Sequence, residues 1–302
     1  MLPAIPALLT ERLIAQYGEE PAREIEAGFV RRPVTLRVNT LKSTVEDVKA
    51  RLTAAGIAYE AVPWYEEALI LPEVREDAVR ALPEYEAGHM YLQSLSSMMP
   101  ALVMEPKKGE SILDMAAAPG GKTTQMAALS ANAALITACE KNKIRAERLQ
   151  FNLDRQGATR VNVMCQDARQ LNDLFKFDKV LLDAPCTGSG TILIAEGEQE
   201  RRMTEEWVAK TAATQKSMLK KALTLLSAGH EMVYSTCSIL RQENEDVLSS
   251  VLPAMNAEIV PIEHPMLESA PLLPVTIPGV MCVKPTALFE GFFVAKIRKR
   301  RK

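Results

Sequence analysis

The chain has 302 residues, 47% of them hydrophobic and 25% charged, with a net charge of −2 at pH 7. This length allows one large domain or two ordinary ones, and the composition is typical of a globular protein that buries a large core. The near-neutral charge argues against a general binder of polyanions.

The cysteines are few, widely spaced and without a CxxC pair. They are Cys139, Cys165, Cys186, Cys237 and Cys282. An odd, scattered set argues against a disulfide framework and against a zinc site, so we expect no metal and a reducing, cytoplasmic location. The first residues lack a basic region before their apolar part, and Glu11 interrupts that part early. The sequence therefore predicts neither a signal peptide nor a membrane-spanning helix.

The first 90 residues predict a small α+β module. Helical spacing of apolar residues runs to about residue 27, and a β-rich segment covers residues 33–40. A helix with Ser43 as its cap is expected over residues 43–55, followed by a strand-like region at 59–71. Basic and aromatic residues in this module could contact RNA, although aromatics in so small a module more often belong to its core. Residues 88–102 read as a connector that leads into a helix.

From Gly109 onward, strands and helices alternate, which indicates a parallel sheet. Strands are predicted at residues 111–115, 134–139, 161–165, 180–182 and 232–234. Helices are predicted from 123 to 129, from 141 to 156, from 204 to a stop at Gly229, and over 239–250, with a charged loop at 196–202. Short strands near 257–260, 280–283 and 291–297 would complete the sheet. We expect two domains, 1–90 and 91–302.

Three consecutive strands of the predicted sheet each end in a carboxylate: Glu140, Asp167 and Asp183. The carboxyl ends of parallel strands are where such sheets bind ligands, and an acid after the second strand suits ribose hydroxyls. The loop 116–122 consists largely of small residues before a helix, so a ligand could approach its backbone amides. It matches neither the phosphate-binding GxxxxGK[ST] pattern nor GxGxxG.

Two cysteines also follow strand ends. Cys186 follows the fourth strand within residues 183–190, and Cys237 follows the fifth within 234–238. These strands are neighbours in a doubly wound sheet, so the two thiols could face one cleft. The alternatives are that Cys186 is a small buried hydrophobe and that Lys122 is a helix-start lysine in water.

The last seven residues, 296–302, contain six cations. A frayed, solubilising end and a contact with RNA phosphates both remain open for this segment.

Residues 114–123, 183–190 and 234–238 together resemble the RNA cytosine-5 methyltransferase family, which pairs Pro-Cys after strand four with Thr-Cys after strand five. Shorter matching stretches extend the resemblance over nearly the whole chain: 36–41, 91–99, 243–245 and 290–296. The final EGFFVAK looks most like the bacterial enzymes that modify 16S ribosomal RNA. Val283-Lys284-Pro285 stands where many members have Pro-His, and we expect a short form without the C-terminal RNA-binding domains of larger relatives.

The resemblance implies an α/β fold, with a class I methyltransferase Rossmann-like doubly wound sheet, an N-terminal RNA-binding module and S-adenosylmethionine as cofactor. Residues 116–122 would contact the methionine end of the cofactor, Glu140 its ribose and Asp167 its adenine, with Asp183 between cofactor and base. The implied cofactor-binding residues are Ala116, Ala117, Ala118, Pro119, Gly120, Gly121, Lys122, Glu140, Arg145, Asp167 and Asp183.

The resemblance also assigns catalytic roles. Cytosine C5 is a weak nucleophile, and addition of a thiolate at C6 activates it, which is covalent catalysis. Cys237 would supply that thiolate and Cys186 would promote its release. Asp183 would hydrogen-bond the N3/N4 edge of the base, and Lys122 would assist electrostatically.

The expected partner is RNA, either ribosomal RNA or the small ribosomal subunit, with no DNA, no membrane and a monomeric protein. A transfer RNA methyltransferase and a non-catalytic ribosome-assembly factor on the same fold are the alternatives. A DNA cytosine methyltransferase would use the Pro-Cys thiol as nucleophile and would not need Cys237.

Overall fold

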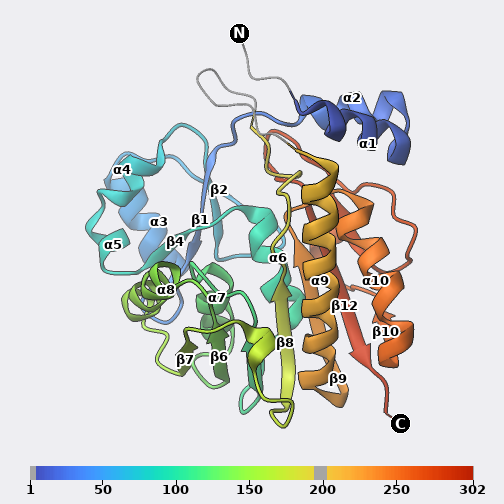
Figure 1. Cartoon of the computed structure of the whole chain (residues 1–302). Helices are drawn as coiled ribbons and strands as arrows, with labels where there is room; N and C mark the ends of the chain where they lie inside the picture. The colour runs from blue at the N-terminus through green and yellow to red at the C-terminus, as the bar shows by residue number, and fades with distance from the viewer. Residues whose placement is uncertain (1–4, 194–202, 302) are drawn as a thin grey trace.

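The computed structural model describes residues 5–193 and 203–301, which form two sheets with helices around them (Figure 1). The predicted charged loop at 196–202 lies outside the described residues. The smaller sheet is antiparallel, with the strand order β2-β3-β1-β4. Its strands are β1 (Val34–Val38), β2 (Glu60–Ala61), β3 (Ala68–Leu71) and β4 (Met90–Leu92).

The helices of the N-terminal part differ in detail from the predicted ones. The expected helix before residue 27 is divided at Gly18 into α1 (Ala7–Tyr17) and α2 (Glu19–Ala27). Helix α3 (Val45–Ala54) is capped by Thr44, which accepts a hydrogen bond from the Asp47 amide, and not by Ser43. Two short helices follow, α4 (Glu76–Arg80) and α5 (Pro83–Glu86).

The predicted connector at residues 88–102 contains strand β4, which pairs with β1 and lies across the expected domain boundary. The connector reading was wrong because this three-residue strand is too short to show a periodic pattern. Helix α6 (Leu95–Met104) then begins at Ser94, whose side chain accepts a hydrogen bond from the Ser97 amide. The division of the chain at residue 90 stays a prediction.

The larger sheet has eight strands in the described part of the chain, in the order β10-β12-β9-β8-β5-β6-β7, with β11 beside β12. The parallel strands are β5 (Ser111–Asp114), β6 (Leu135–Cys139), β7 (Val161–Met164), β8 (Phe177–Asp183) and β9 (Leu226–Thr236). The antiparallel strands are β10 (Ala257–Val260), β11 (Met281–Val283) and β12 (Phe292–Lys299). This mixed α/β sheet confirms the predicted fold class.

The helices between these strands are α7 (Gly121–Leu129), α8 (Lys143–Gln156), α9 (Glu205–Leu225) and α10 (Glu245–Val251). Helix α9 ends earlier than predicted, and Gly229, expected to stop it, lies inside β9. The apolar residues of α9 continue directly into a strand, so the glycine does not mark the boundary.

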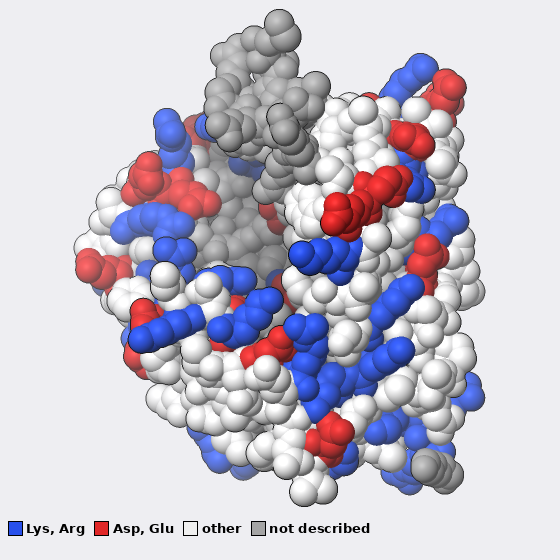
Figure 2. Space-filling model, in the orientation of Figure 1, with Lys and Arg blue, Asp and Glu red and all other residues white. Residues whose placement is uncertain are grey.

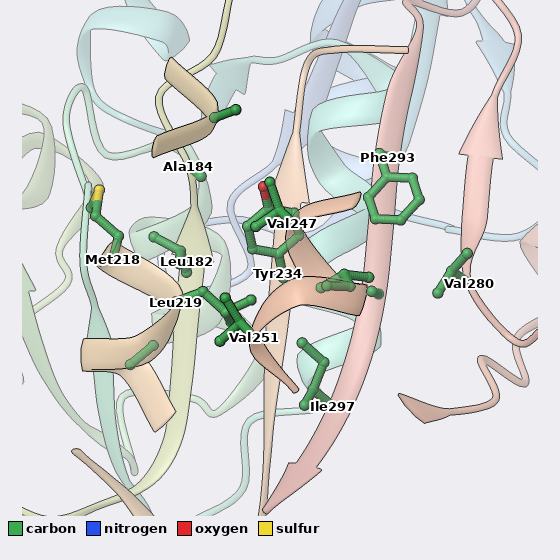
Figure 3. Close-up of a cluster of buried hydrophobic side chains, with 14 of the residues drawn as sticks. Leu182, Ala184, Met218, Leu219, Tyr234, Val247, Val251, Val280, Phe293 and Ile297 are labelled. Carbon is green, nitrogen blue, oxygen red and sulfur yellow. The ribbon is translucent and has the colours of Figure 1, made fainter. Parts of the chain in front are cut away.

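Successive strand residues enter different cores because side chains alternate between the faces of a sheet. On β8, Val180 and Leu182 join the core under α9, α10, α1 and α2, while Leu181 joins the core under α6, α7 and α8. Figure 3 shows part of the first core, where Leu182 and Leu219 pack near Tyr234 and Val251. The sheet is therefore covered on both faces, as a doubly wound fold requires.

The winding of the chain reverses between β5 and β8. From β5 the chain proceeds through β6 to β7 on one side, then returns to place β8 and β9 on the other. In open α/β sheets, ligands bind at the carboxyl ends of the strands at such a reversal.

The basic C-terminal segment belongs largely to strand β12 and is not a frayed end. Lys296 and Arg298 form ion pairs with Glu231, and Arg300 pairs with Glu258. Because β12 runs antiparallel to β9, this segment lies at the opposite end of the sheet from the carboxyl ends of the parallel strands. Contact with RNA bound at those ends would need a substrate that wraps around the molecule.

Neither the helices nor the metal-ligating side chains of residues 5–193 and 203–301 indicate a membrane span or a metal site. Across this part of the chain, the helices include none with the length and apolar character needed to span a bilayer. Its His, Cys, Asp and Glu side chains form no group of three or more that could hold a metal ion.

Arg37, on β1, links the N-terminal sheet to helix α7 from a fully buried position. Its Nε donates to Gln93 Oε1 at 3.2 Å, and its Nη2 donates to Thr124 Oγ1 on α7 at 3.0 Å. Burial lowers the pKa of Arg37. Burying a cation costs free energy unless hydrogen bonds compensate its charge. The hydrogen bonds from Arg37 to Gln93 and Thr124 are therefore both needed, and they hold the N-terminal sheet against α7.

We expect Arg37→Ala to lower the free energy of unfolding by about 3 kcal/mol, because it leaves Gln93 without its donor and opens a void. Urea denaturation followed by circular dichroism measures the change. Arg51→Ala, at an exposed helix position, is the control and should change the stability by less than about 0.5 kcal/mol. Equal stabilities of the two variants would contradict the role of Arg37.

Candidate active site

A cavity of about 860 Å³ lies at the reversal of the sheet, between the two parts of the chain. The N-terminal part contributes Arg31, Arg75 and neighbouring residues to its wall. The larger sheet and its loops contribute Asp114, Ala116, Ala117, Ala118, Pro119, Gly121, Lys122, Asp183, Cys237, Glu290 and Phe292. The structure thus brings most of the residues predicted from the motifs into one hollow.

Lys122 is enclosed in this cavity, with 12% of its side chain exposed. Its Nζ lies 2.7 Å from Asp183 Oδ2 and 2.9 Å from Ser97 Oγ. It also lies 5.3 Å from the centre of the Phe292 ring, within cation–π range. The alternative of a helix-start lysine in water is therefore wrong.

Asp183 ends β8 and is held on both carboxylate oxygens. Ser235, on the neighbouring strand β9, donates its hydroxyl to Asp183 Oδ1 at 2.7 Å, while Lys122 occupies Oδ2. These two partners orient the carboxylate and compensate its charge.

Cys186 and Cys237 lie in contact, with their Sγ atoms 3.2 Å apart although the residues are 51 positions apart in the chain. The pairing of β8 with β9 continues past the strand ends and brings the two thiols together. The Ala184 amide donates to Ser235 O at 2.8 Å, and the Gly190 amide donates to Cys237 O at 3.0 Å.

Two buried polar residues after β9 hold the loops that carry these cysteines. Glu243 accepts hydrogen bonds from the amide and the hydroxyl of Thr187, directly after Cys186. Asn244 accepts from the hydroxyl of Thr236 and donates to Ser238 O, on either side of Cys237. The loop of Cys186 is therefore held by Glu243, and the loop of Cys237 is held by Asn244.

The loop after Cys186 also contacts the start of β12 with no side chain between the two backbones. A Cβ atom on Gly190 would lie 2.1 Å from Gly291 O, and the Gly291 amide donates to Gly190 O at 2.8 Å. Both positions need glycine because any side chain would displace one backbone from the other. Through this contact, Glu290 and Phe292 are held at the cavity.

The two thiols have opposite pKa shifts. A hydrogen bond from Cys186 lowers the pKa of Cys237, and the nearby Lys122 ammonium lowers it further. The same hydrogen bond, together with burial, raises the pKa of Cys186. Of the two thiols, Cys237 is therefore the one that ionises more readily, and Cys186 and Lys122 are the groups that favour its ionisation.

The loop 116–122 is fixed from α8. Arg145 Nη2 donates to Ala118 O at 2.8 Å, and Asn152 Nδ2 donates to Pro119 O at 2.8 Å. Gly120 has φ of 109°, which favours glycine, and its missing side chain leaves room for Leu149 of α8. Arg145 thus positions the loop and does not line the cavity.

Asp114, at the end of β5, is a cavity residue that the motif analysis did not single out. Its Oδ2 accepts a hydrogen bond from Thr123, whereas Oδ1 is buried without a hydrogen-bond partner among the described residues. Burial raises the pKa of Asp114 to about 6. A carboxylate oxygen that lacks a donor suits a ligand with a cationic N–H group, such as an amino-acid ammonium.

Glu140 and Asp167 follow β6 and β7 as predicted, but neither lines this cavity. The Glu140 carboxylate is buried, accepts the Asn142 amide at 2.8 Å and lies 3.6 Å from Arg145. Asp167 is paired with Arg169, whose hydrogen bonds lower the pKa of Asp167. Their assignment to the cofactor stays a prediction.

Sequence reasoning also missed the partners of the predicted residues. Ser97 contacts Lys122, Ser235 contacts Asp183, and Glu243 supports the Cys186 loop. All three lie within or beside the matched stretches, and Ser235 directly precedes Thr236-Cys237. Their roles depend on side-chain directions that such stretches do not reveal.

Comparison with known proteins places this geometry in a family. The family described as "16S rRNA methyltransferase RsmB/F" matches residues 101–298, and the RsmF/B-like "ferredoxin-like domain" matches residues 5–76. A methyltransferase homolog protein from Pyrococcus horikoshii has a TM-score of 0.83 and 34% identity, covering 97% of this chain and 94% of that one. The structure of NSun6 from the same organism with SFG has a TM-score of 0.88 and 25% identity, covering 99% of this chain and 100% of that one.

Two curated relatives show similar identity over part of their length. Ribosomal RNA small subunit methyltransferase F of Aeromonas salmonicida is 36% identical over 283 residues, which are 89% of this chain and 58% of that protein. The human 28S rRNA (cytosine(4447)-C(5))-methyltransferase is 35% identical over 297 residues, 91% of this chain and 35% of that protein. The chain thus spans about a third to little more than half of these relatives, and it belongs to the RsmB/F family of RNA cytosine-5 methyltransferases.

Proposed function

We propose that this chain transfers a methyl group from S-adenosylmethionine to C5 of a cytosine in RNA. The observation that carries the proposal is the contact between Cys186 and Cys237, 3.2 Å apart, where Cys237 shares one cavity with Lys122 and Asp183. A scaffold protein has no chemical use for a thiol pair supported in this way, which disfavours the assembly-factor alternative.

The cavity fits the cofactor of this family. The unpartnered Oδ1 of Asp114 suits the ammonium of the methionine end, and the small side chains of residues 116–119 let a ligand approach this loop closely. Asp183 adds a second carboxylate on the same wall. S-adenosylmethionine, when bound, supplies the methyl group.

Cys237 begins the reaction on the RNA. Its thiolate adds to C6 of the cytosine and forms an S–C6 bond. The C5=C6 double bond is broken in this step, and the resulting enamine is nucleophilic at C5. Asp183 accepts a hydrogen bond from the N4 amino group of the base. Lys122, 2.7 Å from Asp183, holds that carboxylate in place and balances its charge.

Cys186 acts at the end of the reaction. After C5 has been methylated, the C5 proton passes to solvent water, the C5–H electrons re-form the C5=C6 double bond, and the S–C6 bond breaks to return the Cys237 thiolate. The pKa of Cys186 is raised, so the thiol stays protonated and donates a hydrogen bond to the departing sulfur. In this role Cys186 promotes release and does not compete as a nucleophile.

The RNA would enter between the two parts of the chain. Arg31 and Arg75 are exposed at the cavity wall, where they can contact phosphates. Arg32 is held by the carbonyls of Thr286 and Phe289, so its role is to shape the wall. The target cytosine must be unpaired or flipped out of a helix for Cys237 to reach C6.

Small-subunit ribosomal RNA is the substrate that we propose. The matching family is described by 16S rRNA, and the Aeromonas relative carries the name of a small-subunit enzyme. The human relative is named for 28S rRNA, so ribosomal RNA is the shared class. Transfer RNA remains the alternative, and the cytoplasmic location and monomeric state stay predictions.

Bisulfite sequencing of total RNA from a strain lacking this gene tests the substrate. We expect one or more 16S positions to lose protection against deamination, because 5-methylcytosine resists the reaction, while large-subunit and transfer RNA stay unchanged. Complementation with the wild-type gene, but not with Cys237→Ala, should restore protection. A loss confined to transfer RNA would overturn the assignment to ribosomal RNA.

We expect Cys186→Ala to accumulate a covalent protein–RNA adduct that survives denaturing electrophoresis, because addition proceeds while release is slowed. Cys237→Ala and the double variant are matched controls and should form none. An adduct in Cys237→Ala but not in Cys186→Ala would exchange the two roles and indicate the DNA-methyltransferase type of mechanism.

Alkylation by iodoacetamide as a function of pH, followed by mass spectrometry of the Cys237 peptide, tests the activation of this thiol. We expect a midpoint below about 8.5, because the lowered pKa leaves more thiolate at neutral pH and reactivity is lost only as pH falls through that lower value. In Cys186→Ala the hydrogen bond is gone, so the midpoint should rise. Identical midpoints in the two proteins would contradict the proposed activation.

A further inference from the structure

A second hollow, of about 530 Å³, lies where α8 meets the N-terminal part of the chain. Its lining includes Arg148, Phe151 and Arg155 of α8, together with Arg80 and Tyr85. Tyr91, Leu92 and Pro119 also line the catalytic cavity, so the two hollows adjoin. A polymer in the cavity could continue into this second hollow over a short distance.

One face of α8 alternates apolar and cationic side chains. Ile144, Arg148, Phe151 and Arg155 follow at intervals of four, three and four residues, which places them in one row along the helix. Ile144 is 75% exposed and Phe151 is 62% exposed. In Figure 2, Lys and Arg side chains gather over α8 and the adjoining edge of the N-terminal part.

Within the hollow, guanidinium groups and aromatic rings are layered. The Cζ atom of Arg155 lies 4.5 Å from the centre of the Tyr85 ring and 5.7 Å from that of Phe151. The Cζ atom of Arg80 lies 5.5 Å from the centre of the Tyr85 ring, and Arg80 donates to the Tyr85 hydroxyl. The cations are thereby held in fixed positions beside planar apolar surfaces.

Packing between the two parts of the chain accounts for only some of these residues. Arg155 and Tyr85 join α8 to α5, and Arg80 pairs with Glu76. Arg148, in contrast, has no hydrogen bond or ion pair with any residue in the described ranges, and Phe151 exposes most of its ring. The lining contains three arginines and no acid, so the hollow is complementary to a negatively charged ligand with a flat apolar face.

A nucleotide of single-stranded RNA has both properties. Its phosphate pairs with arginine, and its base stacks on an aromatic ring or on a guanidinium plane. We propose that the hollow between Arg148, Phe151 and Arg155 binds an unpaired nucleotide that flanks the target cytosine. This inference rests on the proposed function. The position of the hollow beside Pro119 places this nucleotide next to the catalytic cavity, so the hollow would select targets with an unpaired neighbour.

The test is binding of a short, unstructured, fluorescein-labelled RNA that contains cytosine, measured by fluorescence anisotropy over a range of salt concentrations. Phe151→Ala should weaken binding about tenfold through the lost stacking and leave the salt dependence unchanged. Phe151→Trp should restore affinity. Arg148→Ala should weaken binding and reduce the slope of log affinity against log salt by about 0.7, the value for one phosphate contact on a single strand.

Two neighbouring substitutions on α8 are matched controls. Ile144→Ala removes an exposed apolar side chain from the same face, and Lys143→Ala removes an exposed cation, both outside the hollow. Each should bind the RNA within about twofold of the wild type. Wild-type affinity in both Phe151→Ala and Arg148→Ala would overturn the proposal.

The methylation assay separates this proposal from the proposed function. Phe151→Ala should raise KM for RNA and leave kcat near the wild-type value, because the chemistry occurs in the other cavity. If the wild type shows no methylation while Phe151→Ala still loses RNA affinity, the RNA site stands and the catalytic function fails. If Cys186→Ala forms its adduct but Phe151→Ala binds RNA normally, the catalytic function stands and this site fails.

Discussion

The parallel pairing of β8 with β9 is the constraint on which the site depends. Two amide-to-carbonyl hydrogen bonds extend this pairing beyond the strands, from Ala184 to Ser235 and from Gly190 to Cys237. Because the strands run in the same direction, both chains leave the sheet at one edge, and residues far apart in sequence meet there. The contact between the thiols, and the reach of Ser235 to the Asp183 carboxylate, both follow from this register.

Charge in the cavity is arranged around Lys122. Its ammonium pairs with Asp183, lies over Phe292 and lowers the pKa of Cys237. In a site shielded from water these interactions are stronger than they would be on the surface, so one cation serves both the acid and the thiolate. The raised pKa of Cys186 completes the arrangement, because it keeps the neighbouring thiol neutral and avoids two anions in contact.

Motifs predicted the elements of the larger sheet and singled out Lys122, Asp183 and Cys237, which line the cavity, because strand ends and tight turns leave local signals in the chain. They did not predict β4, Asp114 as a cavity residue or the supports Glu243 and Asn244. These features depend on contacts between segments far apart in sequence. The basic C-terminal segment is a similar case. Its composition does not reveal its ion pairs with Glu231 and Glu258, which depend on the order of the strands.

The contact of Gly190 with Gly291 has a consequence for how this architecture can change. Gly190 and Gly291 must both remain glycine, since a side chain on either residue would have no space between the two backbones. A graft that exchanged the C-terminal third of the molecule for that of a relative would therefore work only if the donor kept glycine at this crossing. Because a side chain at either position would meet the opposite backbone, this crossing is closed to gradual variation.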